Sequence, residues 1–384
     1  MKWSTTTTPA RSSTTRSSPT NDPDERRAYV ALALIDGLGP RRIAQLLSAH
    51  GSAQACLTAP SHDSSTLTGF PRTLVRALHH PPLERADALV AECLAHGHFL
   101  LTPADEDFPA LLRSIPDPPP ILFARGNLAL TNRPAVAIVG SRDHTRYGGE
   151  VAERLGQLAA AAGLVVVSGM ARGLDAVAQR AALEAGGASI GVLGAGVDVV
   201  YPARNRALYE LILRDGLLLS ESPAGTRPEP GSFPRRNRLI SGLALALVVV
   251  EAADGSGTLI TVGSALEQGR EVLAVPGPIT SPTSRGTNRL LRDGAIPLLE
   301  PEDMLVALGL PSEARPLAPP TVPCTLSPTE ARVLAALGPD SRGVDDLAEA
   351  VGLPVGELLA ALLGLELGGL AQQLPGALYR RRGP

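Results

Sequence analysis

Residues 135–142, AVAIVGSR, constrain the fold of this 384-residue chain more than any other stretch. Apolar, mostly β-branched residues end at Gly140 and are followed by Ser141 and Arg142, which predicts a buried strand that leads into a phosphate-binding type of turn. The same order recurs at LVVVSG (164–169), SIGVLG (189–194), GLLLSE (216–221), ALVVVE (246–251) and EVLAVPG (271–277). Helical patterns separate most of these segments, so the sequence predicts a mainly parallel, doubly wound α/β sheet.

The polar turns that follow these strands should gather at one edge of the sheet, because parallel strands all run in one direction. Open α/β folds bind their ligands at this carboxyl edge. The segments that begin near Gly149 and Leu174 carry apolar residues at helical spacing, so we expect two helices that cover a face of the sheet. The function is therefore expected at the carboxyl edge.

The chain is expected to contain five parts. The first 25 residues are rich in Ser, Thr and Pro and lack an apolar core, which predicts a disordered tail and not a secretory signal. A strand, ILFARG (121–126), is expected at the edge of the sheet. The parts are a tail over 1–25, a helical domain like SAM or helix-hairpin-helix modules over 26–102, the sheet domain over 103–310, a proline-rich linker over 311–324 and a winged helix over 325–384.

Two similar turns mark the helical domain, IDGLGPRRIAQLL (35–47) and LTGFPRTLVRAL (67–78). Glycines at such turns free backbone amides to meet a phosphate, as in helix-hairpin-helix modules. A small helical interaction domain with ordinary Gly and Pro turns explains the same residues. The sequence leaves both interpretations open and favours the second.

The last 60 residues read as three helices and a hairpin, which is the layout of a winged helix-turn-helix. The candidate reading helix, 354–365, is expected to expose Gly356, Glu357, Ala360 and Ala361, and it offers no Arg, Asn or Gln to a base edge. A protein-contact or regulatory role is therefore favoured over sequence-specific reading of DNA.

The scarcity of lysine and histidine excludes several kinds of site. Lys2 is the only lysine, and none of the seven histidines comes after His144. A phosphate-loop lysine, a Schiff base, a Ser-His-Asp triad and a metal centre are therefore not expected in the sheet domain, and no catalytic residue or cofactor is predicted. The cysteines are scattered, which indicates reduced thiols. No apolar run has membrane length, so a cytoplasmic location without membrane contact is expected.

The residues expected to bind nucleic acid share the carboxyl edge of the sheet. Glycines let backbone amides approach phosphates, arginines bind phosphates as bidentate forks, and an aromatic ring can stack on an unpaired base. The candidates are Gly140, Ser141, Arg142, Ser168, Gly169, Arg172, Phe233, Arg235, Arg236, Asn237 and Arg238.

Structural roles are open for some of these residues. Ion pairs with Glu221, Glu229 or Glu251 would fix the long loop that carries the arginines of 235–238, and we expect at least one such pair. Phe233 is equally compatible with an anchor in an apolar pocket.

An ordered series of motifs resembles the DNA-processing protein A (DprA) family. The motifs are VAIVGSR, VSGMARGLD, GVLGAGVDVVYPARN, LLLSESPAG, FPRRNRLISGLA, ALVVVEAADGSGTLITVGSALEQGREVLAVPG and SRGTNRLLRDGA, and they cover roughly 108–300. The resemblance implies an extended Rossmann-like fold, a homodimer, and a role in natural transformation. It also implies that Arg142, Phe233 and the 235–238 run hold incoming single-stranded DNA and that the RecA recombinase is a partner. Double-stranded DNA is a further candidate ligand.

The chain departs from the pattern of this family at two places. Where the family usually has an alanine–histidine pair after its GID motif, this chain has Ala178 and Gln179. The basic residue that precedes the loop phenylalanine in the family corresponds here to Pro230 or Gly231. The second departure removes one expected DNA contact.

Two other functions are alternatives to DNA binding. A nucleotide-processing enzyme related to the phosphoribohydrolases is suggested by Gly255–Thr258 followed by Glu267, although the Gly-Gly-x-Gly-Thr run of those enzymes is absent. A NAD-binding Rossmann domain is disfavoured because the first turn lacks GxGxxG. Release of free base from nucleoside monophosphates would identify the enzyme, whereas binding without turnover would identify the DNA-binding protein.

Overall fold

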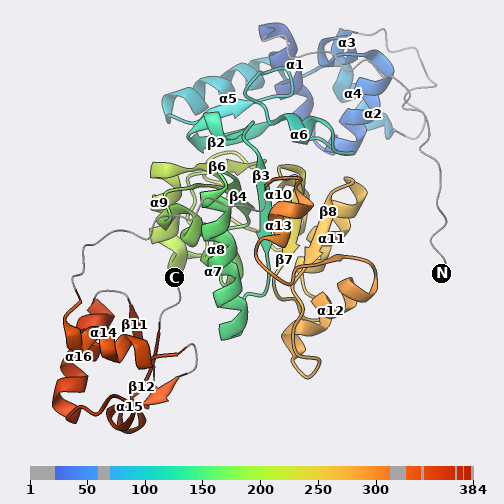
Figure 1. Cartoon of the computed structure of the whole chain (residues 1–384). Helices are drawn as coiled ribbons and strands as arrows, with labels where there is room; N and C mark the ends of the chain where they lie inside the picture. The colour runs from blue at the N-terminus through green and yellow to red at the C-terminus, as the bar shows by residue number, and fades with distance from the viewer. Residues whose placement is uncertain are drawn as a thin grey trace. The chain divides into compact units, whose positions relative to one another are not determined.

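The computed structural model describes residues 22–58, 70–311, 326–338, 341–367, 370–374 and 376–381. The contacts within the chain divide it into two compact units, Met1–Arg315 and Pro316–Pro384. The helices before the sheet therefore belong to the same compact unit as the sheet itself (Figure 1).

A nine-stranded sheet organises the first unit, in the order β1-β2-β6-β5-β4-β3-β7-β8-β9. All neighbouring pairs from β6 to β9 are parallel, whereas β1 and β2 are antiparallel additions. The doubly wound sheet predicted from the sequence is thus confirmed. The strands are β1 Phe99–Leu101, β2 Leu122–Gly126, β3 Ala135–Val139, β4 Val165–Ser168, β5 Ala188–Leu193, β6 Leu217–Ser220, β7 Ala246–Val249, β8 Glu271–Ala274 and β9 Ile296–Pro297.

The strand expected at the edge, β2, lies one place inside it. Residues of β1 pair with β2, with Leu100 opposite Phe123, so β1 is the outermost strand on this side. At the other end of β2, Gly126 has a φ of +118°, and an added Cβ would lie 2.5 Å from the carbonyl oxygen of Gly216. The sequence prediction missed β1 because three apolar residues show too little alternation to indicate a strand.

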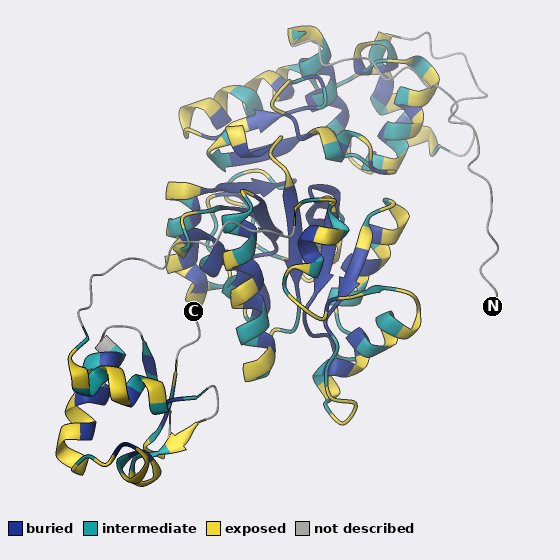
Figure 2. Ribbon diagram, viewed as in Figure 1, coloured by how far each residue is buried: buried dark blue, intermediate teal, exposed yellow. Residues whose placement is uncertain are grey.

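Helices cover both faces of the sheet, as the sequence predicted, and the sheet is the most buried part of the unit (Figures 1 and 2). Helices α7 and α8 bury Leu155 and Ala178 on one face, and α10 and α11 bury Leu239 and Val262 on the other. The helices that flank the sheet are α6 Ala110–Arg113, α7 Arg146–Ala161, α8 Leu174–Glu184, α9 Arg206–Asp215, α10 Ser232–Gly242, α11 Thr258–Glu267, α12 Arg285–Arg292 and α13 Asp303–Ala307, with short 3₁₀ turns at Leu128–Leu130, Ala203–Asn205 and Pro282–Ser284.

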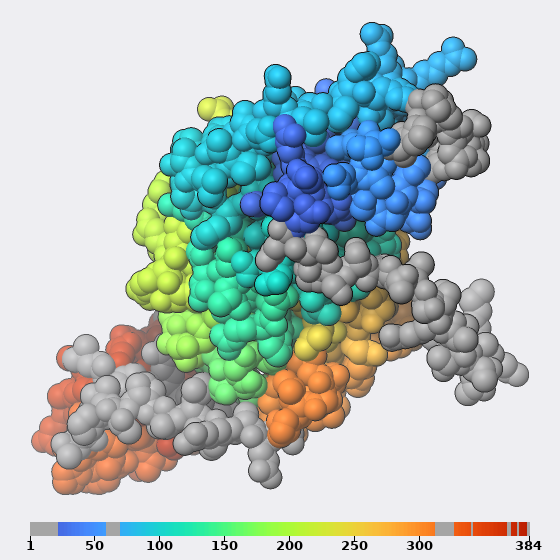
Figure 3. Space-filling model, turned by 90° about the horizontal axis from the view of Figure 1, so that it is seen from above, coloured from blue at the N-terminus to red at the C-terminus, as the bar shows by residue number. Residues whose placement is uncertain are grey.

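The N-terminal helices pack directly against the sheet part of the unit, which a view from above shows (Figure 3). Val30 and Ala31 share a core with Ile121 and Phe123. The predicted tail lies outside the described residues up to residue 21, and α1 begins earlier than expected, because Asp22 accepts a hydrogen bond from the Asp24 amide over 2.9 Å. The helices are α1 Pro23–Ala33, α2 Pro40–His50, α3 Ala53–Thr58, α4 Arg72–His79 and α5 Leu83–Ala95.

The second unit has the three helices and the hairpin of a winged helix. The predicted linker falls almost wholly outside the described residues, which resume at 326. A short strand before the second helix pairs with the hairpin, an addition that the sequence did not suggest. The elements are α14 Pro328–Ala336, β10 Arg342–Gly343, α15 Val344–Val351, α16 Val355–Leu367, β11 Ala371–Leu374 and β12 Leu378–Arg381.

None of the described helices is by itself long and apolar enough to cross a membrane. Residues 344–351 and 355–366 reach the required length and apolarity only as a pair, and a bend of 104° separates them.

Candidate nucleic-acid interface

Two polar turns meet where β3 and β4 end. The first turn begins at Gly140, directly after β3, and the second runs from Gly169 to Gly173, directly after β4. The Leu174 amide donates to the carbonyl oxygen of Ser141 over 3.2 Å, and a Cβ added at Gly173 would lie 2.3 Å from the same oxygen. The turns therefore pack backbone against backbone, as the sequence predicted from the parallel strands.

Buried polar side chains fix the second turn through hydrogen bonds to its backbone amides. Asp175 accepts a hydrogen bond from the Gly169 amide over 3.1 Å. Gln179 accepts from the Met170 amide over 3.2 Å and donates to the Ser189 hydroxyl and the Ile190 carbonyl. Burial raises the pKa of Asp175, although nearby positive charge and amide donors oppose this shift. These contacts fix a turn in which Met170 has a φ of +55°.

Arg142 and Arg172 leave the two turns toward solvent and line one pocket of about 610 Å³. Arg172 pairs with Asp143 over 2.9 Å, whereas the guanidinium of Arg142 makes no ion pair or hydrogen bond within the described part of the chain. His144, the last histidine of the chain, lines the same pocket, so one imidazole lies at this edge of the sheet. The pocket also contains Arg180 and Arg204, which the sequence analysis did not select.

The segment that carries the other candidates is a helix and not the expected long loop. Residues 233–238 form the first turns of α10. Pro234 is compatible with this position because the first turn of a helix has no partner for its missing N–H. The Phe233 ring lies 5.6 Å from that of Tyr201, and a Cβ at Gly194 would approach Phe233 within 3.2 Å. An aromatic pair, half-buried at Phe233, thus stands at the end of β5.

Three of the predicted ligands use their polar groups inside the protein. The Ser168 hydroxyl donates to the Ile138 carbonyl over 2.6 Å, and Gly169 uses both its amide and its carbonyl oxygen. Arg236 is 6% exposed and donates to the carbonyl oxygens of Gly169 and Val192. Burial lowers the pKa of Arg236 to about 10. We infer that these three residues support the turns and do not face a ligand.

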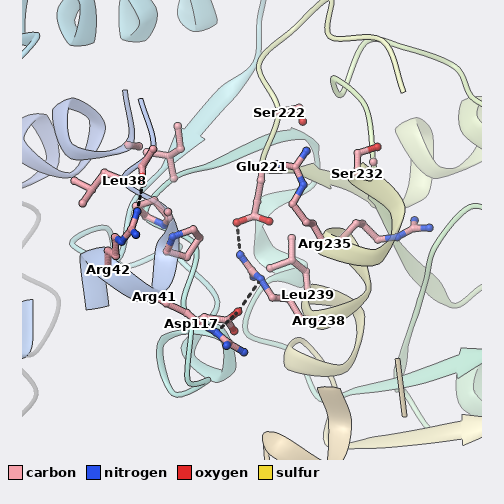
Figure 4. Close-up of a pocket in the computed structure, with 18 of the residues that line it drawn as sticks. Leu38, Arg41, Arg42, Asp117, Glu221, Ser222, Ser232, Arg235, Arg238 and Leu239 are labelled. Carbon is pink, nitrogen blue, oxygen red and sulfur yellow. Dashed lines mark hydrogen bonds and ion pairs between the residues drawn. The ribbon is translucent and has the colours of Figure 1, made fainter. Parts of the chain in front are cut away.

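Arg238 forms the ion pair that the sequence analysis expected of at least one arginine. It contacts Glu221 at 2.5 Å and, unexpectedly, Asp117 at 3.3 Å (Figure 4). Asn237 donates to the Gly257 carbonyl over 3.3 Å and remains partly exposed. Arg235 is exposed, and its side chain makes no ion pair or hydrogen bond with other residues that the structure describes. The groups that remain accessible at the edge are therefore Gly140, Ser141, Arg142, Arg172, Phe233, Arg235 and Asn237.

Comparison with known proteins shows which family the chain belongs to. The family model described as DNA recombination-mediator protein A matches residues 99–309, and that of the DprA winged helix domain matches residues 316–377. The chain belongs to the DNA recombination-mediator protein A family. The DprA resemblance read from the motifs is thereby confirmed.

Curated relatives of this family are similar over most of the chain. The Smf protein of Escherichia coli is 43% identical over 295 residues, which cover 73% of this chain and 77% of that protein. The Smf protein of Synechocystis is 37% identical over 319 residues, which cover 73% of this chain and 80% of that protein.

Two solved DprA structures have the same fold. The structure from Streptococcus pneumoniae is 33% identical, covers 74% of this chain and 97% of that one, and has a TM-score of 0.63. DNA processing protein A of Helicobacter pylori, reported for its single-stranded DNA binding mode, is 30% identical, covers 55% of this chain and 95% of that one, and has a TM-score of 0.51.

The fold explains one of the two departures from the DprA pattern. Gln179 replaces the usual histidine, and its amide both accepts and donates a hydrogen bond inside the unit. A neutral imidazole offers the same combination of one acceptor and one donor. The other departure, at Pro230 and Gly231, lies in exposed backbone directly before α10 and is not compensated by a nearby side-chain contact in the described part of the chain.

Proposed function

We propose that this chain binds single-stranded DNA during natural transformation and loads the RecA recombinase onto the bound strand. One arrangement supports the proposal above all others: exposed Arg142 and Arg235 flank the glycine-rich turns, beside an aromatic pair of Phe233 and Tyr201. Arginine forks suit phosphates, and exposed rings suit unpaired bases. The single-stranded DNA binding reported for the Helicobacter pylori relative agrees with this reading.

The proposed activity is binding without chemical conversion of the DNA. The arginines at the edge cannot act as general bases, because a guanidinium stays protonated. The competing enzyme hypothesis retains groups that can transfer protons, among them His144, whose Nδ1 lies 2.8 Å from the Thr145 carbonyl oxygen. Sustained release of free base from nucleoside monophosphates, abolished by Glu267→Ala, would favour the enzyme.

We further propose that the protein acts as a homodimer in the cytoplasm, where incoming strands and RecA meet. The sheet-containing unit exposes several large apolar side chains, which suits an interface between copies. They include Leu94, Phe99, Leu245, Ile260, Leu266, Ile279, Leu299 and Val306. Light scattering should report twice the monomer mass, and a monomer at tens of micromolar would contradict this part of the proposal.

A mobility-shift titration tests the central proposal. Labelled single-stranded and duplex oligonucleotides of one sequence should be titrated with the full chain at two salt concentrations. We expect tighter binding of the single strand and an affinity that falls with salt, because phosphate contacts release counterions. RecA loading is tested separately, by whether the protein accelerates assembly of RecA on a strand that is already coated with a single-strand binding protein.

A further inference from the structure

A pocket of about 730 Å³ lies between the turn that precedes α2 and the start of α10 (Figure 4). Gly37, Leu38 and Arg41 form one wall, and Arg235 and Leu239 form the other. Both walls belong to the same compact unit. The pocket therefore joins the N-terminal helices to the edge of the sheet where Phe233 and the arginines of α10 lie.

The charges in this pocket are not balanced within the protein. Its lining contains five arginines and three carboxylates. Arg238 already contacts two of these carboxylates, those of Asp117 and Glu221. Arg41 reaches the carboxylates of Asp117 and Glu267 at 3.9 Å each, the limit of an ion pair, and its side chain is 77% exposed. Arg235 lies close enough to Glu221 to act on its charge but forms no ion pair in the described chain, so both walls still present an exposed arginine.

Arg238, which also lines the pocket, has a hydrogen-bond donor that no described residue satisfies. Its Nη1 atom is buried and has no hydrogen-bond partner in the described part of the chain, although Nε and Nη2 contact carboxylates. An unpaired buried donor is costly. A ligand with oxygen acceptors that entered the pocket would relieve this cost directly or through water.

We propose that this pocket is a second subsite for single-stranded DNA, in which the N-terminal helices supply a wall. Phosphates of the strand contact Arg41 on one side and Arg235 on the other, above a floor closed by the buried side chains of Leu38 and Leu239. The inference rests on the proposed function and extends it, because it makes the helical part a DNA-contacting element and not only an interaction domain. A phosphodiester fits better than a single compact anion, since the arginines stand on opposite walls of a large pocket.

The test uses the full chain and labelled oligothymidylate at several salt concentrations. Arg41→Ala should weaken binding several-fold and flatten the slope of log affinity against log salt by about 0.7, the contribution of one phosphate contact in a single strand. Asp36→Asn should strengthen binding, because Asp36 is an exposed carboxylate in the lining of the pocket. Arg85→Ala is the matched control, since Arg85 is an exposed arginine of α5 outside the pocket.

The outcomes separate this inference from the proposed function. Arg142→Ala, measured in parallel, reports on the edge of the sheet alone. If Arg142→Ala weakens binding while Arg41→Ala and Arg85→Ala both behave like the wild type, the second subsite is wrong and the proposed function stands. If the wild type binds no single-stranded DNA, the proposed function fails first. A thermal melt of each variant confirms that the exposed substitutions leave the fold intact.

Discussion

The Nη1 atom of Arg236 lies 2.5 Å from the carbonyl oxygen of Gly169. The same guanidinium also donates to the Val192 carbonyl and is close enough to Asp175 for that carboxylate to favour its charged form. Arg236 thus links the turn after β4 to the end of β5 from inside the protein. An arginine that resembles a DNA ligand in the sequence supports, in the structure, the edge of the sheet where we propose that DNA binds.

Arg236→Met should therefore cost stability more than it changes the salt dependence of binding. Methionine keeps much of the bulk of the side chain, but it leaves the carbonyl oxygens of Gly169 and Val192 without their donor and removes the positive charge near Asp175. Removal of one partner from a buried charged pair costs about 3–5 kcal/mol. We expect a loss of this size in the free energy of unfolding, measured by urea denaturation.

The neighbouring arginine provides the control for this variant. Arg235→Met replaces an exposed side chain, so the free energy of unfolding should change by less than about 0.5 kcal/mol. If Arg236→Met is as stable as the wild type and instead lowers the salt slope of DNA binding, Arg236 is a ligand and the inference from burial is wrong.

Gln179 should be replaceable by histidine but not by alanine. Gln179→Ala leaves the buried Met170 amide without its acceptor and removes the donor to the Ser189 hydroxyl, at a cost of about 1–3 kcal/mol. Gln179→His restores one acceptor and one donor. We expect the alanine variant to lose stability and single-strand affinity together, and the histidine variant to keep both within a few-fold.

Thermal melts and titrations of the two variants check this expectation. Equal behaviour of Gln179→Ala and the wild type would show that the turn after β4 keeps its conformation without the buried amide. A histidine variant that is as damaged as the alanine variant would show that the shape of the side chain matters more than its hydrogen-bonding groups.

The sheet was predictable from the sequence because buried parallel strands read as continuous apolar runs, of which 135–139 is the clearest. The meeting of the turns at 140–142 and 168–173 followed from the parallel direction alone. The roles of individual arginines did not follow. In FPRRNR, side chains at successive helical positions point in different directions, so Arg235 is exposed while Arg236 is buried. A segment predicted as loop gave no reason to separate them.

Contacts between segments that lie far apart in the chain could not be predicted from the sequence either. The expected partner of Arg238 was one of three glutamates, and Glu221 proved correct, but Asp117 belongs to the proline-dense segment before β2. Arg41 comes from still further away and approaches the same carboxylate. No periodicity or motif reports such proximity, because it depends on how the N-terminal helices pack against the sheet.

The winged helix should be dispensable for binding of single strands. Helix α16 exposes Glu357 as predicted but buries Ala361, contrary to expectation, and its exposed face carries the apolar residues Val355, Leu359 and Leu363. Such a face offers no hydrogen bonds to base edges and suits a protein partner better. Deletion of residues 320–384 should leave the affinity within a few-fold in a mobility-shift titration. A hundredfold loss with the first unit still folded would show that this unit binds DNA.

Arg142 and Phe233 should affect binding in different ways, and the difference tests the proposed edge most directly. Arg142 is exposed directly after Gly140 and Ser141, at the ligand-binding edge of the sheet. Arg142→Ala should weaken binding to all sequences alike and flatten the salt slope by about 0.7, because one phosphate contact is lost. Phe233→Leu should cost about 1–3 kcal/mol of binding free energy through lost stacking and leave the slope nearly unchanged.

Both variants should be titrated over a series of salt concentrations and checked for folding and oligomeric state. The leucine at 233 keeps an apolar contact with Tyr201, so a loss of affinity reports on the ring and not on the packing of α10. If Arg142→Ala keeps the affinity and the slope of the wild type, the arginine is structural and the strand takes another path. If Phe233→Leu also binds normally, the ring only anchors α10, and the arginines alone must account for the affinity.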